Sequence, residues 1–202
     1  MSFSYETKNE LCRLPVQKLC CARAEAYGIL LYCNTFSATE VRVITENPNF
    51  AERLPKLFRR AFGLSFDRQP DKEQIEGKRI FQITDPRKLN HIINVLGYDP
   101  QQNLVLHINF AFMEEACDQA AFLRGAFFAG GSITDPQKRY HLELTTSHLQ
   151  VSREIESLLV ECGYPPKSLS RNGSSITYFK QSDQIEDFLT MIGAPVAAMN
   201  IM

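Results

Sequence analysis

The sequence has no excess of positive charge. Its 202 residues include 22 Lys and Arg against 23 Asp and Glu, a formal net charge of -1 at pH 7. Proteins that bind DNA by themselves are usually basic, because their cations neutralise phosphates. The balance therefore argues against strong autonomous DNA binding. At this length, with 44% hydrophobic residues, the chain can bury one substantial core or two small ones.

Long apolar runs and metal-binding spacings are also missing. No stretch approaches the ~20 apolar residues of a membrane span, and no charged leader precedes an apolar run, so a cytoplasmic protein without a membrane partner is expected. The six cysteines contain no CxxC pair, and the four histidines form no HxxxH or HExxH pattern. We therefore expect no metal, no cofactor and no disulfide framework, and cysteines that are reduced and mostly buried. For the adjacent Cys20 and Cys21, a redox sensor is the alternative.

The chain repeats itself at an offset of 97 residues. Residues 24–32 resemble residues 121–129, with Gly28 aligned to Gly125. The strand-like runs 41–45 and 142–146 also correspond, and each leads into an amphipathic helical pattern that stops at Gly63 or Gly163. A further strand, near 78–83 or 175–180, and a closing helix complete each copy. We predict an α+β protein with a first repeat at 1–97, a linker at 98–110, a second repeat at 111–196 and a tail at 197–202.

Both copies carry a glycine inside a predicted helix. Glycine there costs about 1 kcal/mol relative to alanine, so its recurrence calls for a compensating contact. Small residues four apart give each helix a groove in which another backbone can approach. The two helices are therefore predicted to pack against each other, whereas the alternative is that each glycine only accommodates a bulky neighbour. The small residues are Ala24, Gly28, Ala121, Gly125 and Ala129.

Residues 123–131, LRGAFFAGG, resemble a degenerate LAGLIDADG motif, and residues 122–136, FLRGAFFAGGSITDP, are similar to the WhiA family of sporulation regulators. The resemblance implies a LAGLIDADG homing-endonuclease-like fold of two tandem αββαββα-type repeats, forming a pseudo-twofold monomer with a saddle of mixed strand topology. It also implies a bacterial transcription regulator of sporulation or cell division, associated with the nucleoid. In that family a C-terminal helix-turn-helix domain, absent here, is the main DNA reader, and residues 197–202 lie where the linker to it would begin.

The resemblance places the last acid of the motif at Cys33 in the first copy and at Gly130 in the second. Metal-assisted DNA cleavage needs a carboxylate at such positions to hold Mg²⁺ beside the phosphate. The nearest acids, Glu40 and Asp135, lie several residues beyond the helix ends. We therefore expect no enzyme activity, and an active homing endonuclease is the least favoured function.

Cations on or beside the predicted strands are the candidates for contacts to DNA phosphates. Glutamates lie among them, so a merely solvated strand face is the alternative. Two functions stay open: DNA association through this surface, or a module that binds another regulatory protein while DNA recognition rests in the absent domain. The candidate cations are Arg42, Lys78, Arg79, Lys138, Arg139, Arg171 and Lys180.

Overall fold

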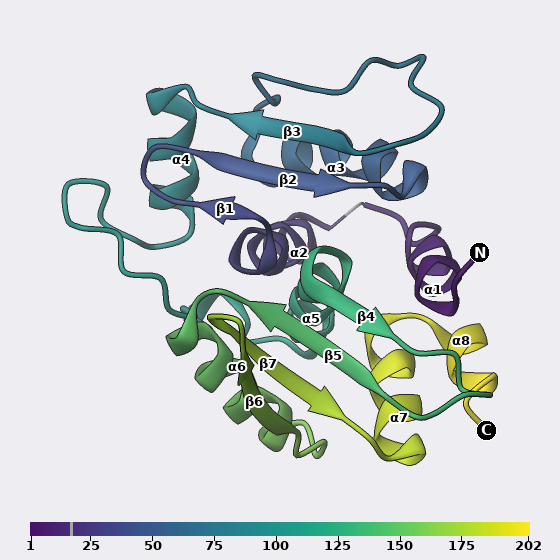
Figure 1. The fold of residues 1–202 in the computed structure, drawn as a ribbon. Helices are drawn as coiled ribbons and strands as arrows, with labels where there is room; N and C mark the ends of the chain where they lie inside the picture. The colour runs from purple at the N-terminus through teal and green to yellow at the C-terminus, as the bar shows by residue number, and fades with distance from the viewer. Residues whose placement is uncertain (17) are drawn as a thin grey trace.

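The computed structural model describes residues 1–16 and 18–202. The chain folds into two similar halves around a central pair of helices (Figure 1). The first half comprises α2 (Leu19–Tyr32), β1 (Thr35–Phe36), β2 (Val41–Thr45), α3 (Pro48–Phe62), β3 (Arg79–Ile83) and α4 (Pro86–Val95). The second comprises α5 (Ala116–Gly130), β4 (Gly131–Ile133), β5 (Leu142–Thr146), α6 (Leu149–Glu161), β6 (Lys167–Arg171), β7 (Ser174–Phe179) and α7 (Ser182–Ile192). The remaining elements are α1 (Phe3–Leu11), η1 (Phe110–Phe112) and α8 (Pro195–Met199). Within the described ranges, no helix is long and apolar enough to cross a membrane.

Each half contributes one sheet. The strand orders are β1-β2-β3 and β4-β5-β7-β6, and every pairing of these strands is antiparallel, so the expected mixed topology is wrong. The second half follows the αββαββα order. In the first half the polar segment before β3 forms only an isolated bridge, Arg68 to Gln82, and no strand like β6 is found among the described residues. That segment lacks the alternating apolar side chains that hold a strand on a core.

Cap and turn residues determine where several elements begin and end. The Asn47 side chain accepts hydrogen bonds from the backbone N–H groups of Asn49 and Phe50, which caps α3. Gly63 ends the same helix with a φ of 70°, a left-handed conformation that glycine adopts without strain. Asn172 and Gly173, both with positive φ, form the hairpin turn between β6 and β7.

The two glycine-containing helices, α2 and α5, cross at the centre of the molecule. A Cβ on Gly28 would lie 2.1 Å from the Phe122 carbonyl oxygen, and a Cβ on Gly125 would lie 2.0 Å from that of Glu25. The offset of 97 residues relates the two contacts, because Gly28 corresponds to Gly125 and Glu25 corresponds to Phe122. The contact is therefore reciprocal. A pseudo-twofold axis therefore passes through the crossing, where only glycine leaves room for the opposing backbone.

The other three small residues lie on the same two helices. Ala24 and Ala121 are fully buried, and Ala129 is half-buried near the end of α5. Both helices are apolar on nearly every side, as expected of helices at the centre of a core. The packing of α2 on α5 thus joins the cores of both repeats into one.

The segment expected to be a linker is fixed to the first repeat. The buried Tyr27 hydroxyl lies 2.6 Å from the Tyr98 hydroxyl, donates to the His107 carbonyl and accepts from the Asn109 N–H. The two ends of the linker, at Tyr98 and at residues 107–109, are therefore held by hydrogen bonds to Tyr27.

The C-terminal tail is also folded onto the body of the protein. The Glu10 carboxylate in α1 accepts hydrogen bonds from the backbone N–H groups of Val196 and Ala197, at 2.8 and 2.9 Å. Ala198 and Ile201 are buried. The start of α8, beside which an interdomain linker was expected to begin, is thus held against α1.

Candidate functional site

The first position of a catalytic acid, Cys33, lies where α2 ends. Its sulfur lies 3.3 Å from the carbonyl oxygens of both Leu30 and Thr35, either of which can accept its single S–H hydrogen bond. Burial raises the pKa of Cys33 to about 12. A protonated thiol turned toward the backbone does not provide the hard oxygen ligand that Mg²⁺ needs.

The second position, Gly130, ends α5 and has no room for a side chain. A Cβ there would lie 2.4 Å from the Thr145 carbonyl oxygen and 2.9 Å from the ring of Tyr32. The Tyr32 hydroxyl is buried without a hydrogen-bond partner among the described residues, and burial raises its pKa. Strand β5 and an aromatic ring thus occupy the space into which a carboxylate would project.

The nearest acids serve local structure. A Glu40 carboxylate oxygen accepts from the Gln82 amide at 2.8 Å and from the Arg42 guanidinium at 3.0 Å, and the Gln82 bond in particular lowers the pKa of Glu40. Asp135 accepts from the backbone N–H of Gln137 in the turn after β4. Neither substitutes for the missing pair of carboxylates.

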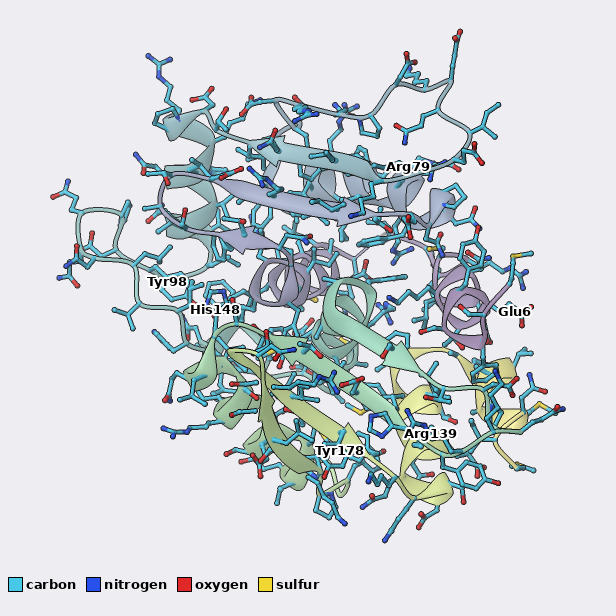
Figure 2. All side chains as sticks on the ribbon, in the orientation of Figure 1. Glu6, Arg79, Tyr98, Arg139, His148 and Tyr178 are labelled. Carbon is cyan, nitrogen blue, oxygen red and sulfur yellow. The ribbon has the colours of Figure 1, made fainter. Side chains whose placement is uncertain are left out.

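In the first repeat, the structure separates the three predicted phosphate-binding cations. Arg42 lies on the outer face of its sheet, the face away from α3, and is paired with Glu40; Lys78 is exposed just before β3. Arg79 is 5% exposed, and its guanidinium donates to four backbone carbonyls, of residues 46, 74, 75 and 77 (Figure 2). Arg79 fixes the loop before β3 and is not available to bind a phosphate.

In the second repeat, four predicted cations lie on or beside the outer face of the sheet. Lys138 and Arg139 are exposed between β4 and β5, and Lys180 lies 5.6 Å from the centroid of the Tyr178 ring (Figure 2). The Arg171 guanidinium lies 3.1 Å from the Glu143 carboxylate.

A glutamate thus neutralises one arginine on each outer face, Glu40 on the first sheet and Glu143 on the second. Four predicted cations are exposed and have no acidic partner among the described residues: Lys78, Lys138, Arg139 and Lys180. These four are the side chains from which a phosphate-binding surface can be built.

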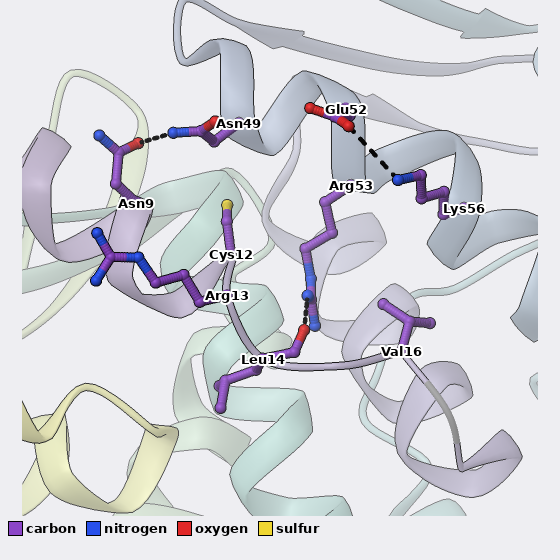
Figure 3. Close-up of a pocket in the computed structure, with 9 residues that line it drawn as sticks. All are labelled: Asn9, Cys12, Arg13, Leu14, Val16, Asn49, Glu52, Arg53 and Lys56. Atoms are coloured by element: carbon purple, nitrogen blue, oxygen red, sulfur yellow. Dashed lines mark hydrogen bonds and ion pairs between the residues drawn. The ribbon is translucent and has the colours of Figure 1, made fainter.

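A buried charge cluster was not predicted from the sequence. Glu25 in α2 is 1% exposed, and both of its carboxylate oxygens accept from the Arg53 guanidinium at 2.8 Å. The Arg124 guanidinium, from the other repeat, donates to the same carboxylate at 2.6 Å. Arg53 also donates to the Leu14 carbonyl, at the edge of a groove of about 520 Å³ between α1 and α3 (Figure 3). One carboxylate therefore ties α3 of the first repeat to α5 of the second.

Similar solved structures define the fold. The crystal structure of the N-terminal LAGLIDADG domain of DUF199/WhiA matches with a TM-score of 0.72 and 19% identity, over 95% of this chain and 92% of that chain. The structure of I-DmoI in complex with DNA and Ca matches with a TM-score of 0.63 and 12% identity, over 91% of this chain and 98% of that one. The fold is that of the LAGLIDADG homing endonucleases.

The family follows from sequence similarity. A family model described as the WhiA LAGLIDADG-like domain matches residues 119–202. The chain is 34% identical over its whole length to a probable cell division protein WhiA of Ruminiclostridium cellulolyticum, and 30% identical to that of Alkaliphilus metalliredigens. It spans 66% and 67% of those two proteins, about two thirds of their length. The chain belongs to the WhiA family.

Proposed function

We propose that this chain is the non-catalytic LAGLIDADG-like region of a WhiA-type bacterial transcription regulator that acts in sporulation or cell division. The observation that supports this proposal most directly is that the fold of a DNA-cutting enzyme is kept without its acids. One acid position holds the Cys33 thiol, which faces backbone carbonyls, and the other holds Gly130, where a side chain has no room. We infer a monomer in the cytoplasm, associated with the nucleoid, that needs no cofactor for this role.

The exposed cations on the outer strand faces supply the DNA contact in this proposal. Contacts to phosphates position a protein on DNA but read no sequence, so base recognition would rest with a helix-turn-helix domain elsewhere in the full-length regulator. A chain with a formal net charge of -1 suits such an auxiliary role. The homing endonuclease I-DmoI, a structural neighbour, is in complex with DNA.

Binding to DNA should depend on salt and on the exposed loop cations. A labelled duplex of arbitrary sequence is expected to bind at low salt, with log K falling linearly as log salt rises. The double variant Lys138→Ala/Arg139→Ala should reduce the magnitude of this slope by about 1 to 2, because each phosphate contact contributes about 0.9. Fluorescence anisotropy across a salt series measures both quantities.

Lys56→Ala is the matched control for that experiment. Lys56 is an exposed cation on α3, which lies behind the strands, and it pairs with Glu52 at 3.5 Å. Its removal should leave the slope unchanged. An equal loss in both variants would show that binding does not use the outer strand faces.

A protein-interaction module is the second candidate, favoured by one observation. Glu40 and Glu143 neutralise Arg42 and Arg171 on the two outer faces, where a phosphate-binding surface would gain from free cations. Absence of DNA binding by this chain even at low salt, together with binding by a longer chain that contains the helix-turn-helix, would support this candidate over the first.

A further inference from the structure

The adjacent Cys20 and Cys21 come together in the structure with Cys117, which is distant in the sequence. The sulfur atoms of Cys20, Cys21 and Cys117 and a carboxylate oxygen of Asp118 all lie within 4.8 Å of one another. The Asp118 oxygen is 3.6 Å from the Cys21 sulfur and 3.8 Å from the Cys117 sulfur. Thiolates and a carboxylate are ligands that Zn²⁺ takes in four-coordinate sites.

The four groups come from equivalent places in the two repeats. Cys20 and Cys117 are 97 residues apart, and so are Cys21 and Asp118, which is the offset of the whole duplication. Both pairs lie in the first turn of their helices, α2 and α5. A twofold axis of a tetrahedron exchanges its four corners in two pairs. Cys20 with Cys117, and Cys21 with Asp118, are two such pairs about the pseudo-twofold axis, so the four groups suit a tetrahedral ion.

We propose that Cys20, Cys21, Cys117 and Asp118 bind one Zn²⁺, which joins the N-terminal ends of the two central helices. In a tetrahedral site with Zn–S distances of about 2.3 Å, the sulfur atoms lie about 3.8 Å apart. The four ligand atoms already lie close to that spacing, and side-chain rotation brings them the remaining distance of about 1 Å or less.

The charges of the site can be balanced. Three thiolates and one carboxylate carry four negative charges. With Zn²⁺ bound, the net charge of the site is -2. The Lys18 ammonium group lies 3.5 Å from the Cys117 sulfur, and the N-terminal ends of α2 and α5 each add a partial positive charge. The cysteine protons leave to solvent as the ion binds, so the affinity for Zn²⁺ falls as pH falls.

The site differs from that of a nuclease in place and in chemistry. A helix of 14 or 15 residues is about 20 Å long, so the cluster lies about that far from Cys33 and Gly130 at the opposite helix ends. Soft thiolates favour Zn²⁺ over the Mg²⁺ that DNA cleavage uses. Cys117 is exposed, and Cys21 lines a groove of about 240 Å³, so an ion from solvent can reach the ligands.

A cobalt titration tests the proposal, because Co²⁺ bound by thiolates in a tetrahedral site absorbs strongly. Reduced, chelator-treated protein should bind one Co²⁺ per chain with thiolate charge-transfer absorption, and Zn²⁺ should displace it. Cys117→Ser should weaken binding at least about tenfold. Cys162→Ser removes a half-buried cysteine outside the cluster, at the end of α6, and should bind as the parent does.

Thermal melting separates a binding defect from a folding defect. Zn²⁺ should raise the Tm of the parent and of Cys162→Ser but not of Cys117→Ser, while all three melt alike without metal. Weak octahedral cobalt spectra, or equal losses in the two variants, would overturn the proposal. A disulfide among these cysteines would also overturn it. The result would be four free thiols instead of six before reduction, and no Zn²⁺ binding by the reduced protein.

Discussion

Gly28→Ala is expected to destabilise the protein by about 3 kcal/mol, the upper end of the usual cost of overpacking a core. The added Cβ would lie 2.1 Å from the Phe122 carbonyl oxygen and 2.8 Å from the Ala126 nitrogen. Both obstacles are backbone atoms, which cannot rotate away. The two central helices would have to separate, and the shared core of both repeats would open.

Two further variants make this result specific, with urea unfolding as the measurement. Gly125→Ala should lose a similar amount, because its Cβ meets the Glu25 carbonyl in the reciprocal contact. Gly163→Ala adds the same methyl at a left-handed position with open space around it, and should lose only about 1 kcal/mol. A loss at Gly28 no larger than that at Gly163 would contradict the close crossing.

Glu25→Gln is the other substitution with a large expected effect, about 3–5 kcal/mol in the free energy of unfolding. It removes the negative charge shared by Arg53 and Arg124 and leaves the Arg53 guanidinium buried without a counter-charge. Breaking one side of a buried ion pair is costly because the remaining charge has already lost its water.

Glu52→Gln is the matched control, again followed by urea unfolding. Glu52 pairs with Lys56 one turn away on α3, and both side chains are about 70% exposed. Such a pair contributes about 0.3–0.5 kcal/mol. Similar losses for Glu25→Gln and Glu52→Gln would show that the buried cluster does not hold the repeats together.

The architecture could be predicted because its signals are local and occur twice. Gly28 and Gly125, at equivalent positions of the two repeats, predicted that their helices pack closely, and the structure has this contact. Gly63 marked the end of a helix because the left-handed backbone conformation there favours glycine. The mixed strand topology was wrong, because it came from the family resemblance and no pattern of residues supported it.

The roles of individual charges were harder to predict, because they depend on three-dimensional contacts. Arg79 shares the side of β3 that carries the buried Phe81 and Ile83, so the strand alternation itself could have placed it inward. Glu25 had no such signal, since its arginines lie on other elements. Five of the six cysteines are half-buried and Cys117 is exposed, so they are less buried than expected.

The cysteine cluster shows a different limit of sequence patterns. Metal sites are recognised by short spacings such as CxxC, but here the ligands of each symmetric pair are 97 residues apart. A duplication brings the same position of two repeats to one axis. The offset of the repeat, applied to Cys20 and Cys21, is the signal that points to Cys117 and Asp118.

The most direct test of the central claim is whether the purified chain cuts DNA. Supercoiled plasmid incubated with the protein and Mg²⁺ or Mn²⁺ should stay supercoiled, because the positions of the catalytic acids are occupied by Cys33 and Gly130. Metal-dependent nicking that persists through repurification and is stopped by a chelator would contradict the account.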